Sequence, residues 1–411
     1  MRSLKYWVWL SSISGVGAIT SMRLIKHFGD PEKVFYAKRL DFDTIEGVSA
    51  RELGGVFEKS LDKANKVLAS CEELGIKVVT FYDKLYPDRL RNIYDPPPVL
   101  YVSGNMPYID DEPIVSIVGT RDCTPYGISC ANGISRELAR SGIIVATGLA
   151  LGVDTAAAVG ALSSGGKVIG IVGSGHGIIY PPENKELFGD VENFGAIISE
   201  YPPHTPAVRW HFPARNRLLA GISLGVAVIE APKRSGALIT ASRALEQGRD
   251  VFALPGNVDA VSCVGSNALL RDGAIPILSA DDIISEYIDL FPNKISRVPL
   301  DDASHIGNTY EKKHVYKSDL TASTKPKSKK EIDNTSVVDY IDVDMIIDSL
   351  EGNARIIAEY IGSNAAHIDE IIMGTALSPS QVLSEITMLE IKGIITASSG
   401  KNYSLTKLKM L

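Results

Sequence analysis

Short apolar runs alternate with longer amphipathic stretches through the middle of the chain. The runs 114–118, 143–146 and 167–172 are rich in Ile and Val and show no regular polar alternation. Such runs are typical of parallel strands that are covered on both faces. Stretches of helical length, such as 126–141, separate them. The alternation predicts an α/β domain, about 71–290, with a doubly wound and mostly parallel sheet.

The predicted strands end in glycine or in small polar residues. The carboxyl ends of neighbouring parallel strands face one crevice, so we expect these loops to converge on a single binding edge that suits phosphates. Each loop alone is a weak signal, because neither a dinucleotide fingerprint nor a P-loop lysine motif is present. The strand ends in question contain Gly119, Thr120, Arg121, Thr147, Gly148, Ser174 and Gly175.

A basic stretch, 209–249, surrounds the apolar run 218–229. The run predicts a helix that leads into a buried strand, and the turn after it opens a second helix. A helix N-terminus at the end of a strand is a ready site for an anion. Arginines on a solvated helix face are the alternative for any single cation. The cations are Arg209, Arg215, Arg217, Lys233, Arg234, Arg243 and Arg249, against the acids Glu230 and Glu246.

The two ends of the chain predict smaller modules. Residues 1–70 show short helical patterns after Gly-containing turns, as in helix-hairpin-helix or sterile-alpha-motif-like domains, which can offer backbone N–H groups to DNA phosphates. A small helical packing domain fits the same pattern. Residues 291–342 mix lysines with Ser, Thr, Asp and Pro and predict a basic linker.

Residues 343–411 predict a winged helix, in which a helix-turn-helix pattern is followed by a hairpin-like tail at 394–405. The expected recognition helix carries Glu385 and Glu390, with Lys392 at its end. Sequence-specific DNA reading needs hydrogen-bond donors and cations there. A protein-contact or packing role is therefore favoured for this module over a transcription-factor role.

Composition narrows the class of protein. A chain of 411 residues with 45% hydrophobic and 22% charged residues is expected to form two or three globular domains. Four cysteines without Cys-x-x-Cys spacing predict neither a zinc site nor a disulfide scaffold. No run has membrane-spanning length and no cleavable signal segment is evident, so a cytoplasmic protein without metal or cofactor is expected. The formal net charge of -7 leaves a local basic DNA site open.

Many motifs together resemble the DNA-processing protein A family, DprA, also called Smf, over nearly the whole chain. The resemblance implies a helical N-terminal domain, an extended Rossmann-like domain and a C-terminal winged helix. It further implies a homodimer that binds single-stranded DNA, protects incoming strands and loads the RecA recombinase during natural transformation, without enzymatic activity. The motifs are Val118-Gly119-Thr120-Arg121, 147–157, Tyr180-Pro181-Pro182-Glu183-Asn184, Ser199-Glu200-Tyr201-Pro202, Phe212-Pro213, Arg215-Asn216-Arg217, 235–241, Gly248-Arg249, Pro255-Gly256 and Gly265-Ser266-Asn267.

The resemblance also implies a binding pocket in which backbone N–H groups and cations hold phosphates. Phe212 is the candidate stacking platform, although a core residue beside Pro213 is equally consistent with its type, and Asn216 is expected to brace the pocket. Leu151 and Ala158 stand where the family usually has arginine and histidine, which removes two polar groups near the expected pocket. The implied site is Gly119, Thr120, Arg121, Thr147, Gly148, Ser174, Gly175, Arg209, Phe212, Arg215, Asn216, Arg217, Lys233, Ser235, Gly236 and Thr240.

A Rossmann-like nucleotide or sugar-phosphate hydrolase is the alternative. In that hypothesis Glu200 or Glu230, each at a strand end, acts as general base. The related phosphoribohydrolases carry a Pro-Gly-Gly-x-Gly-Thr-x-x-Glu signature, which Pro255-Gly256-Asn257-Val258 breaks. The sequence therefore favours a single-strand binder over an enzyme.

Overall fold

The structure is a computed structural model of the whole chain. It describes residues 4–42, 44–297, 352–361, 366–375, 377–391, 394–398 and 402–405. The chain divides into two units, Met1–Thr321 and Ala322–Leu411. Most of the predicted linker, 298–342, lies outside the described residues. Its first residues, 291–297, are described, and Ile295 is buried in the core of the first unit.

Helices fill the N-terminal part of the first unit, as the sequence predicts. α1 buries Trp7 through Leu10 in a core that also contains Val99 and Tyr101 of the neighbouring sheet. Gly29 ends α2 in the left-handed region (φ 84°), and a capping box between Ser49 and Glu52 starts α4. The contact of these helices with DNA stays a prediction. They are α1 (Leu4–Ser11), α2 (Ala18–Phe28), α3 (Pro31–Tyr36), α4 (Ala50–Val56) and α5 (Asp62–Glu73).

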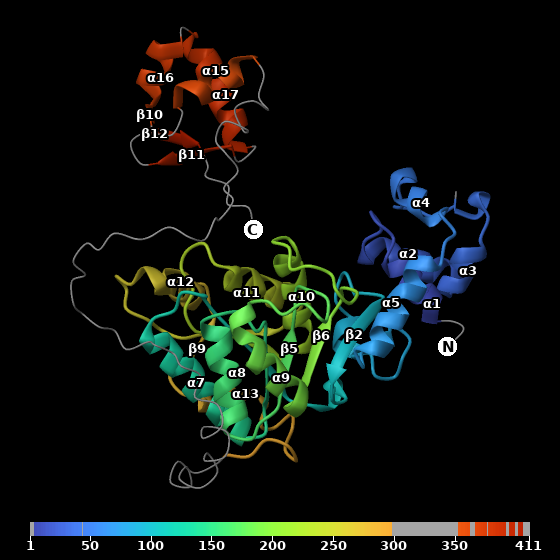
Figure 1. Cartoon of the computed structure of the whole chain (residues 1–411). Helices are drawn as coiled ribbons and strands as arrows, with labels where there is room; N and C mark the ends of the chain where they lie inside the picture. Colours follow the sequence, from blue (N-terminus) through green and yellow to red (C-terminus); the bar gives the residue numbers. More distant parts are fainter. Residues whose placement is uncertain are drawn as a thin grey trace, which may run out of the picture. The chain divides into compact units, whose positions relative to one another are not determined.

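A nine-stranded sheet with the order β1-β2-β6-β5-β4-β3-β7-β8-β9 crosses the described part of this unit (Figure 1). The strands from β6 to β9 in this order pair in parallel, whereas β2 runs antiparallel to both β1 and β6. The predicted mostly parallel sheet is thus confirmed. The strands are β1 (Lys77–Thr80), β2 (Val99–Gly104), β3 (Ile114–Val118), β4 (Ile144–Thr147), β5 (Val168–Ile171), β6 (Ala196–Ser199), β7 (Gly225–Val228), β8 (Asp250–Ala253) and β9 (Ile275–Pro276).

Two layers of helices cover the sheet and form a core on each face. Side chains alternate along a strand, so Val115 and Ile117 of β3 face one core while Ile114 and Val118 face the other. The first layer contains α7 (Pro125–Arg140), α8 (Val153–Ser163), α9 (Lys185–Phe194) and α13 (Asp281–Tyr287). The second contains α6 (Asp88–Arg91), α10 (His211–Ile222), α11 (Gly236–Glu246) and α12 (Val264–Arg271).

The order of the strands creates one switch point, between β3 and β7. The chain runs outward from β3 through β4 and β5 to β6, then returns to place β7 on the other side of β3. The helices that follow the two strands, α7 and α11, pack on opposite faces. The loops after β3 and β7 therefore diverge, and a crevice at the carboxyl ends of these strands is expected.

The second unit is the predicted winged helix. A three-stranded antiparallel sheet, in the order β10-β12-β11, accompanies three helices around a core that includes Ile357, Ile371, Val382 and Leu389. The elements are α15 (Gly352–Ile361), β10 (Ala366–His367), α16 (Ile368–Thr375), α17 (Pro379–Ile391), β11 (Ile395–Ser398) and β12 (Asn402–Leu405). Within the described ranges, every helix is too short or too polar to cross a bilayer.

Candidate functional site

A cavity of about 340 Å³ lies at the switch point between β3 and β7. Nine of the predicted site residues line it, from the loop after β3, the first turns of α10 and the start of α11. The lining consists of Val118, Gly119, Thr120, Arg121, Asp122, Ala150, Asp154, Phe212, Arg215, Asn216, Leu219, Pro232, Arg234, Ser235, Gly236, Ala237 and Thr240.

The loop after β3 is pressed closely against α8. A Cβ on Gly119 would lie 2.5 Å from Cγ2 of Val153, so only glycine permits this approach. The backbone N–H of Thr120 donates to Glu230 O at 2.7 Å and ties the loop to the end of β7. These contacts fix the loop and present Arg121, which is exposed, at the cavity.

Arg121 and Phe212 form the mouth of the cavity. The guanidinium of Arg121 lies 5.2 Å from the centre of the Phe212 ring and 5.9 Å from that of Tyr180. Phe212 is half-buried, packs at 5.4 Å from Tyr180 and rests on Gly173, where a Cβ would lie 3.2 Å from its ring. The ring is thus in contact with Gly173, Tyr180 and Arg121. A cation and an aromatic ring stand together where a phosphate and a base can reach them.

Arg215 and Asp154 form the buried wall of the cavity. Arg215 Nη1 donates to Gly148 O at 3.1 Å and to Ile171 O, which are the carboxyl ends of β4 and β5. Asp154 accepts from the N–H groups of Gly148 (3.0 Å) and Ala150 (3.4 Å). Burial raises the pKa of Asp154 and lowers the pKa of Arg215 to about 10, while the charge of each partner opposes both shifts. Arg215 therefore holds the strand ends in place, and Asp154 offsets its charge within the wall.

Asn216 and Ser235 position the start of α11 at the cavity. Asn216 Nδ2 donates to Gly236 O at 3.2 Å, which is the contact expected of a bracing residue. Ser235 is the N-cap of α11, and its Oγ accepts from Ala237 N at 3.2 Å. Thr240, one turn further on, donates to Gly236 O at 3.4 Å. The positive end of the α11 dipole therefore meets the cavity, where an anion is stabilised.

Arg217 is on the same helix as Arg215 but has a different environment. Its guanidinium makes two hydrogen bonds of 2.8 Å to the carboxylate of Glu200 and an ion pair of 2.8 Å with Asp95. Burial alone would lower the pKa of Arg217, but the two carboxylates outweigh it and raise the pKa. The side chain is outside the cavity lining, so the structure gives it a buried ion pair in place of the predicted phosphate contact.

Four other predicted residues stand behind the cavity and not in it. Gly148 donates its N–H to Asp154, and Gly175 donates its N–H to Thr205 O at 2.9 Å. Ser174 is buried, and its hydroxyl donates to Ile178 O at 2.9 Å. Thr147, at the end of β4, is fully buried. Gly175, one of the two residues expected to offer an N–H group, uses that group inside the protein, and a phosphate contact at these four positions stays a prediction.

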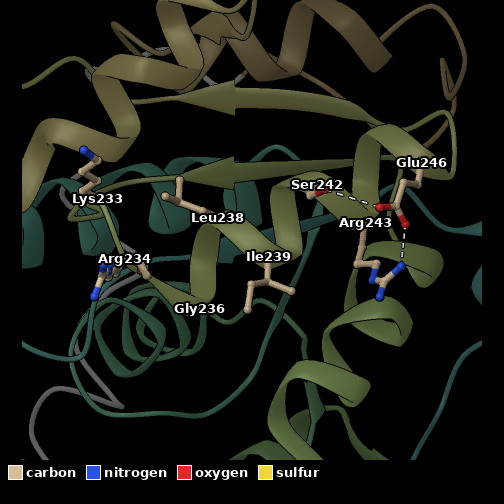
Figure 2. A pocket seen from close by; sticks show the side chains of 9 residues that line it. Lys233, Arg234, Gly236, Leu238, Ile239, Ser242, Arg243 and Glu246 are labelled. Carbon is tan, nitrogen blue, oxygen red and sulfur yellow. Dashed lines mark hydrogen bonds and ion pairs between the residues drawn. The ribbon is translucent and has the colours of Figure 1, made fainter. Parts of the chain in front are cut away.

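A second, open groove of about 590 Å³ runs along α11 and contains the predicted Lys233. Figure 2 shows Lys233 and Arg234 at one end and the Arg243–Glu246 ion pair (2.6 Å) at the other. Arg234 lines both the groove and the cavity. The sequence placed Arg234 in the basic stretch but not in the site. Its position in the turn before α11, next to the predicted Lys233 and Ser235, could have indicated that it belongs to the site.

The remaining positions lie at or beyond the edges of the cavity. Arg209 is exposed in the loop before α10. Leu151 is 37% exposed beside the cavity residue Ala150. Ala158 is fully buried in the core, one turn of α8 beyond the cavity residue Asp154, and does not line the cavity.

Both candidate catalytic carboxylates are engaged in structural contacts. Glu200 pairs with Arg217, as described above. Glu230 is 1% exposed and accepts from the N–H of Thr124 (2.8 Å) and from its hydroxyl (2.6 Å) at the start of α7. Neither carboxylate lines the cavity. Among the described residues, no cluster of His, Cys, Asp and Glu could hold a metal ion.

Comparisons with known proteins agree with this architecture. The family model described as DNA recombination-mediator protein A matches residues 77–288, and the DprA winged helix domain matches 344–401. The chain is 32% identical to Protein Smf of Synechocystis over 409 residues, which cover 97% of this chain and 98% of that protein. It is 38% identical to DNA processing protein DprA of Bacillus subtilis over 257 residues, 62% of this chain and 86% of that protein.

A solved structure is also similar. The X-ray structure of DNA processing protein A from Streptococcus pneumoniae superposes with a TM-score of 0.59 at 33% identity. The superposed region comprises 68% of this chain and 96% of the Streptococcus pneumoniae chain. The sequence, the sheet and the winged helix thus point to one family.

Proposed function

The chain belongs to the DprA/Smf family, and on this basis we propose that it binds single-stranded DNA at the cavity between β3 and β7. DNA processing is the role that the names of its relatives state. The pairing of Arg121 with Phe212 at the cavity mouth carries the proposal. It offers one group for a phosphate and one for a base.

The chemistry of the cavity suits a strand of any sequence. Arg121, Arg215 and Arg234 supply positive charge, which Asp122 and Asp154 offset only in part, and the start of α11 supplies a dipole. These groups recognise the phosphate backbone, which is the same for every sequence. A base stacked on Phe212 would add about 1–3 kcal/mol whatever its identity, because every base has a π face. An unpaired strand fits better than a duplex, whose bases are stacked on one another.

Protection of the strand and its transfer to a RecA recombinase complete the proposal, together with a homodimer in the cytoplasm. These parts rest on the family relationship. The winged helix has a partner-contact role in this scheme, because α17 carries Glu385 and Glu390. Sequence reading in the major groove would need donors and cations instead.

A hydrolase is the less favoured function. A general base must reach the proton that it removes. Glu200 is held by Arg217 through two hydrogen bonds, and Glu230 is held by Thr124. Both carboxylates lie outside the cavity lining. In this proposal the chain therefore binds single-stranded DNA and has no catalytic residues.

The test is a pair of measurements on the full chain. Fluorescence anisotropy of labelled oligo-dT and of a duplex of equal length, across a salt series, gives the preference for single strands and its electrostatic part. Release of base or phosphate from mononucleotides is followed in parallel. The expected result is a salt-sensitive preference for the single strand with no turnover. Equal affinity for both DNAs, or turnover of a mononucleotide, would favour the hydrolase.

A further inference from the structure

Trp210 is a large aromatic side chain left exposed at the edge of the proposed DNA site. Its exposed fraction is 72%, whereas the neighbouring His211 and Phe212 are half-buried. It is the N-cap residue of α10 and has helical backbone angles (φ -76°, ψ -14°). The three aromatic residues therefore share the rigid first turn of one helix.

The two neighbours of Trp210 anchor this turn. The His211 ring stacks on Tyr201 at 3.8 Å with an interplanar angle of 19°, and its Nδ1 donates to Gly173 O at 3.0 Å. Phe212 packs on Gly173 and beneath Arg121. Trp210 meets the His211 ring edge to face, with ring centres 6.1 Å apart at 83°. The anchored turn thus fixes the backbone position of Trp210, while most of the indole surface stays exposed to solvent.

We infer that Trp210 is a second stacking platform, which takes a base of the single strand just outside the cavity. The inference rests on the proposed function. Residues two apart on a helix point about 200° away from each other, so Phe212 faces the cavity and Trp210 faces outward. A strand that leaves the cavity across the start of α10 meets both rings in succession. The exposed Arg209 beside Trp210 is suited to the phosphate between them.

Charge favours DNA as the occupant over a protein surface. The exposed indole follows Arg209 and precedes the cavity residue Phe212 by two positions. Three arginines line that cavity against two aspartates: Arg121, Arg215 and Arg234 against Asp122 and Asp154. A polyanion with aromatic bases complements both features at once, and an indole tolerates any base. Trp210 would lengthen the bound strand without adding sequence preference.

The chain provides its own probe for this contact. It contains three tryptophans, and Trp7 and Trp9 are buried in α1 with exposed fractions of 3% and 4%. Titration of the full chain with oligo-dT should quench part of the tryptophan emission and protect it from acrylamide. Trp210→Phe should abolish the emission change and keep most of the affinity. Trp210→Ala should weaken binding about five- to tenfold, the lower part of the range for loss of one stacked base.

Phe194→Ala is the matched control. Phe194 is 54% exposed at the end of α9, next to the amino end of β6 and therefore at the opposite edge of the sheet. This variant should leave both the affinity and the emission change intact. Equal losses in Phe194→Ala and Trp210→Ala would overturn the inference.

The outcomes separate the inference from the proposed function. If oligo-dT binds by anisotropy while the Trp210 emission stays unchanged, Trp210 is no platform and the function stands. If oligo-dT does not bind at all, the proposed function fails and the inference fails with it. If the emission depends on protein concentration without DNA, Trp210 lies between copies of the chain and the inference is wrong.

Discussion

Arg217 and Glu200 meet through two parallel N–H···O bonds of 2.8 Å each, between α10 and the end of β6. Only 8% of the arginine side chain and 14% of the glutamate side chain are exposed. Asp95 adds a third charge from the loop before β2. This contact joins three separate segments outside the cavity, so we expect it to stabilise the fold and not to contact DNA.

Loss of Arg217 should therefore destabilise the protein. Arg217→Met leaves two carboxylates without their partner, which costs about 3–5 kcal/mol for a buried pair. Urea denaturation measures the free energy of unfolding. Arg243→Met is the control, because the ion pair of Arg243 with Glu246 is about half exposed and should cost less than about 1 kcal/mol. The affinity of folded Arg217→Met for oligo-dT should equal that of the unmodified chain. A selective loss of affinity with normal stability would restore Arg217 to the binding site.

Arg121→Ala should weaken the binding of all single strands to the same degree. Loss of one charge-assisted hydrogen bond of about 1.5 kcal/mol corresponds to about tenfold in affinity. The slope of log K against log salt should fall by about 0.7 for one lost phosphate contact on a single strand. Lys233→Ala, in the groove along α11, should act in the same direction.

The control for these two variants is Lys167→Ala, which removes an exposed cation just before β5 at the amino edge of the sheet. It should leave affinity and slope unchanged. Normal binding by Arg121→Ala and by Lys233→Ala would contradict the proposed cavity.

Truncation of the chain at two different positions should affect DNA binding and the free energy of unfolding differently. Residues 291–297 belong to the folded unit: Ile295 is 3% exposed, and Ser296 N donates to Ser141 O at 3.0 Å. A chain of residues 1–297 should keep most of the affinity for oligo-dT. A chain of residues 1–290 should unfold more easily by about 2–5 kcal/mol, the usual cost of removing a buried isoleucine side chain. Loss of binding in the 1–297 chain would move the main DNA site to the linker or the winged helix.

The N-terminal helices should lose stability in acid through Glu52. Hydrogen bonds from Ser49, the largest cause, and from Thr20 lower the pKa of Glu52 from 4.5 to about 2. The depressed pKa stabilises the fold above pH 4.5, and this contribution is lost as the pH falls from 4.5 to about 2. Glu52→Gln should remove this part of the acid sensitivity, measured by thermal unfolding at several pH values. If Glu52→Gln loses as much stability in acid as the unmodified chain, other carboxylates are the cause of that loss.

The sequence predicted the sheet and several loops that line the cavity, but not the environment of each cation. Apolar runs that end in glycine identified the strands and the loop at Gly119. A strand and the loop after it are encoded by residues that are close together in the sequence, so a local pattern is enough to predict them. Arg215 and Arg217 are identical in type and two residues apart, yet one lines the cavity and the other is neutralised. The partner of Arg217, Asp95, comes from a distant segment, and local patterns carry no information about that contact. The antiparallel pairing of β2 with β6 depends on the same kind of distant contact.

The binding cavity has a consequence for the order of folding. Its two sides are joined where Thr124, after β3, bonds to Glu230, after β7, and these residues are 106 positions apart in the chain. The loop between them must close before the cavity exists, which costs conformational entropy before any contact there repays it. During synthesis, a chain that has emerged only as far as β6 carries Arg121 but no opposite wall. The growing polypeptide should therefore acquire its affinity for DNA late and abruptly, once α11 has docked.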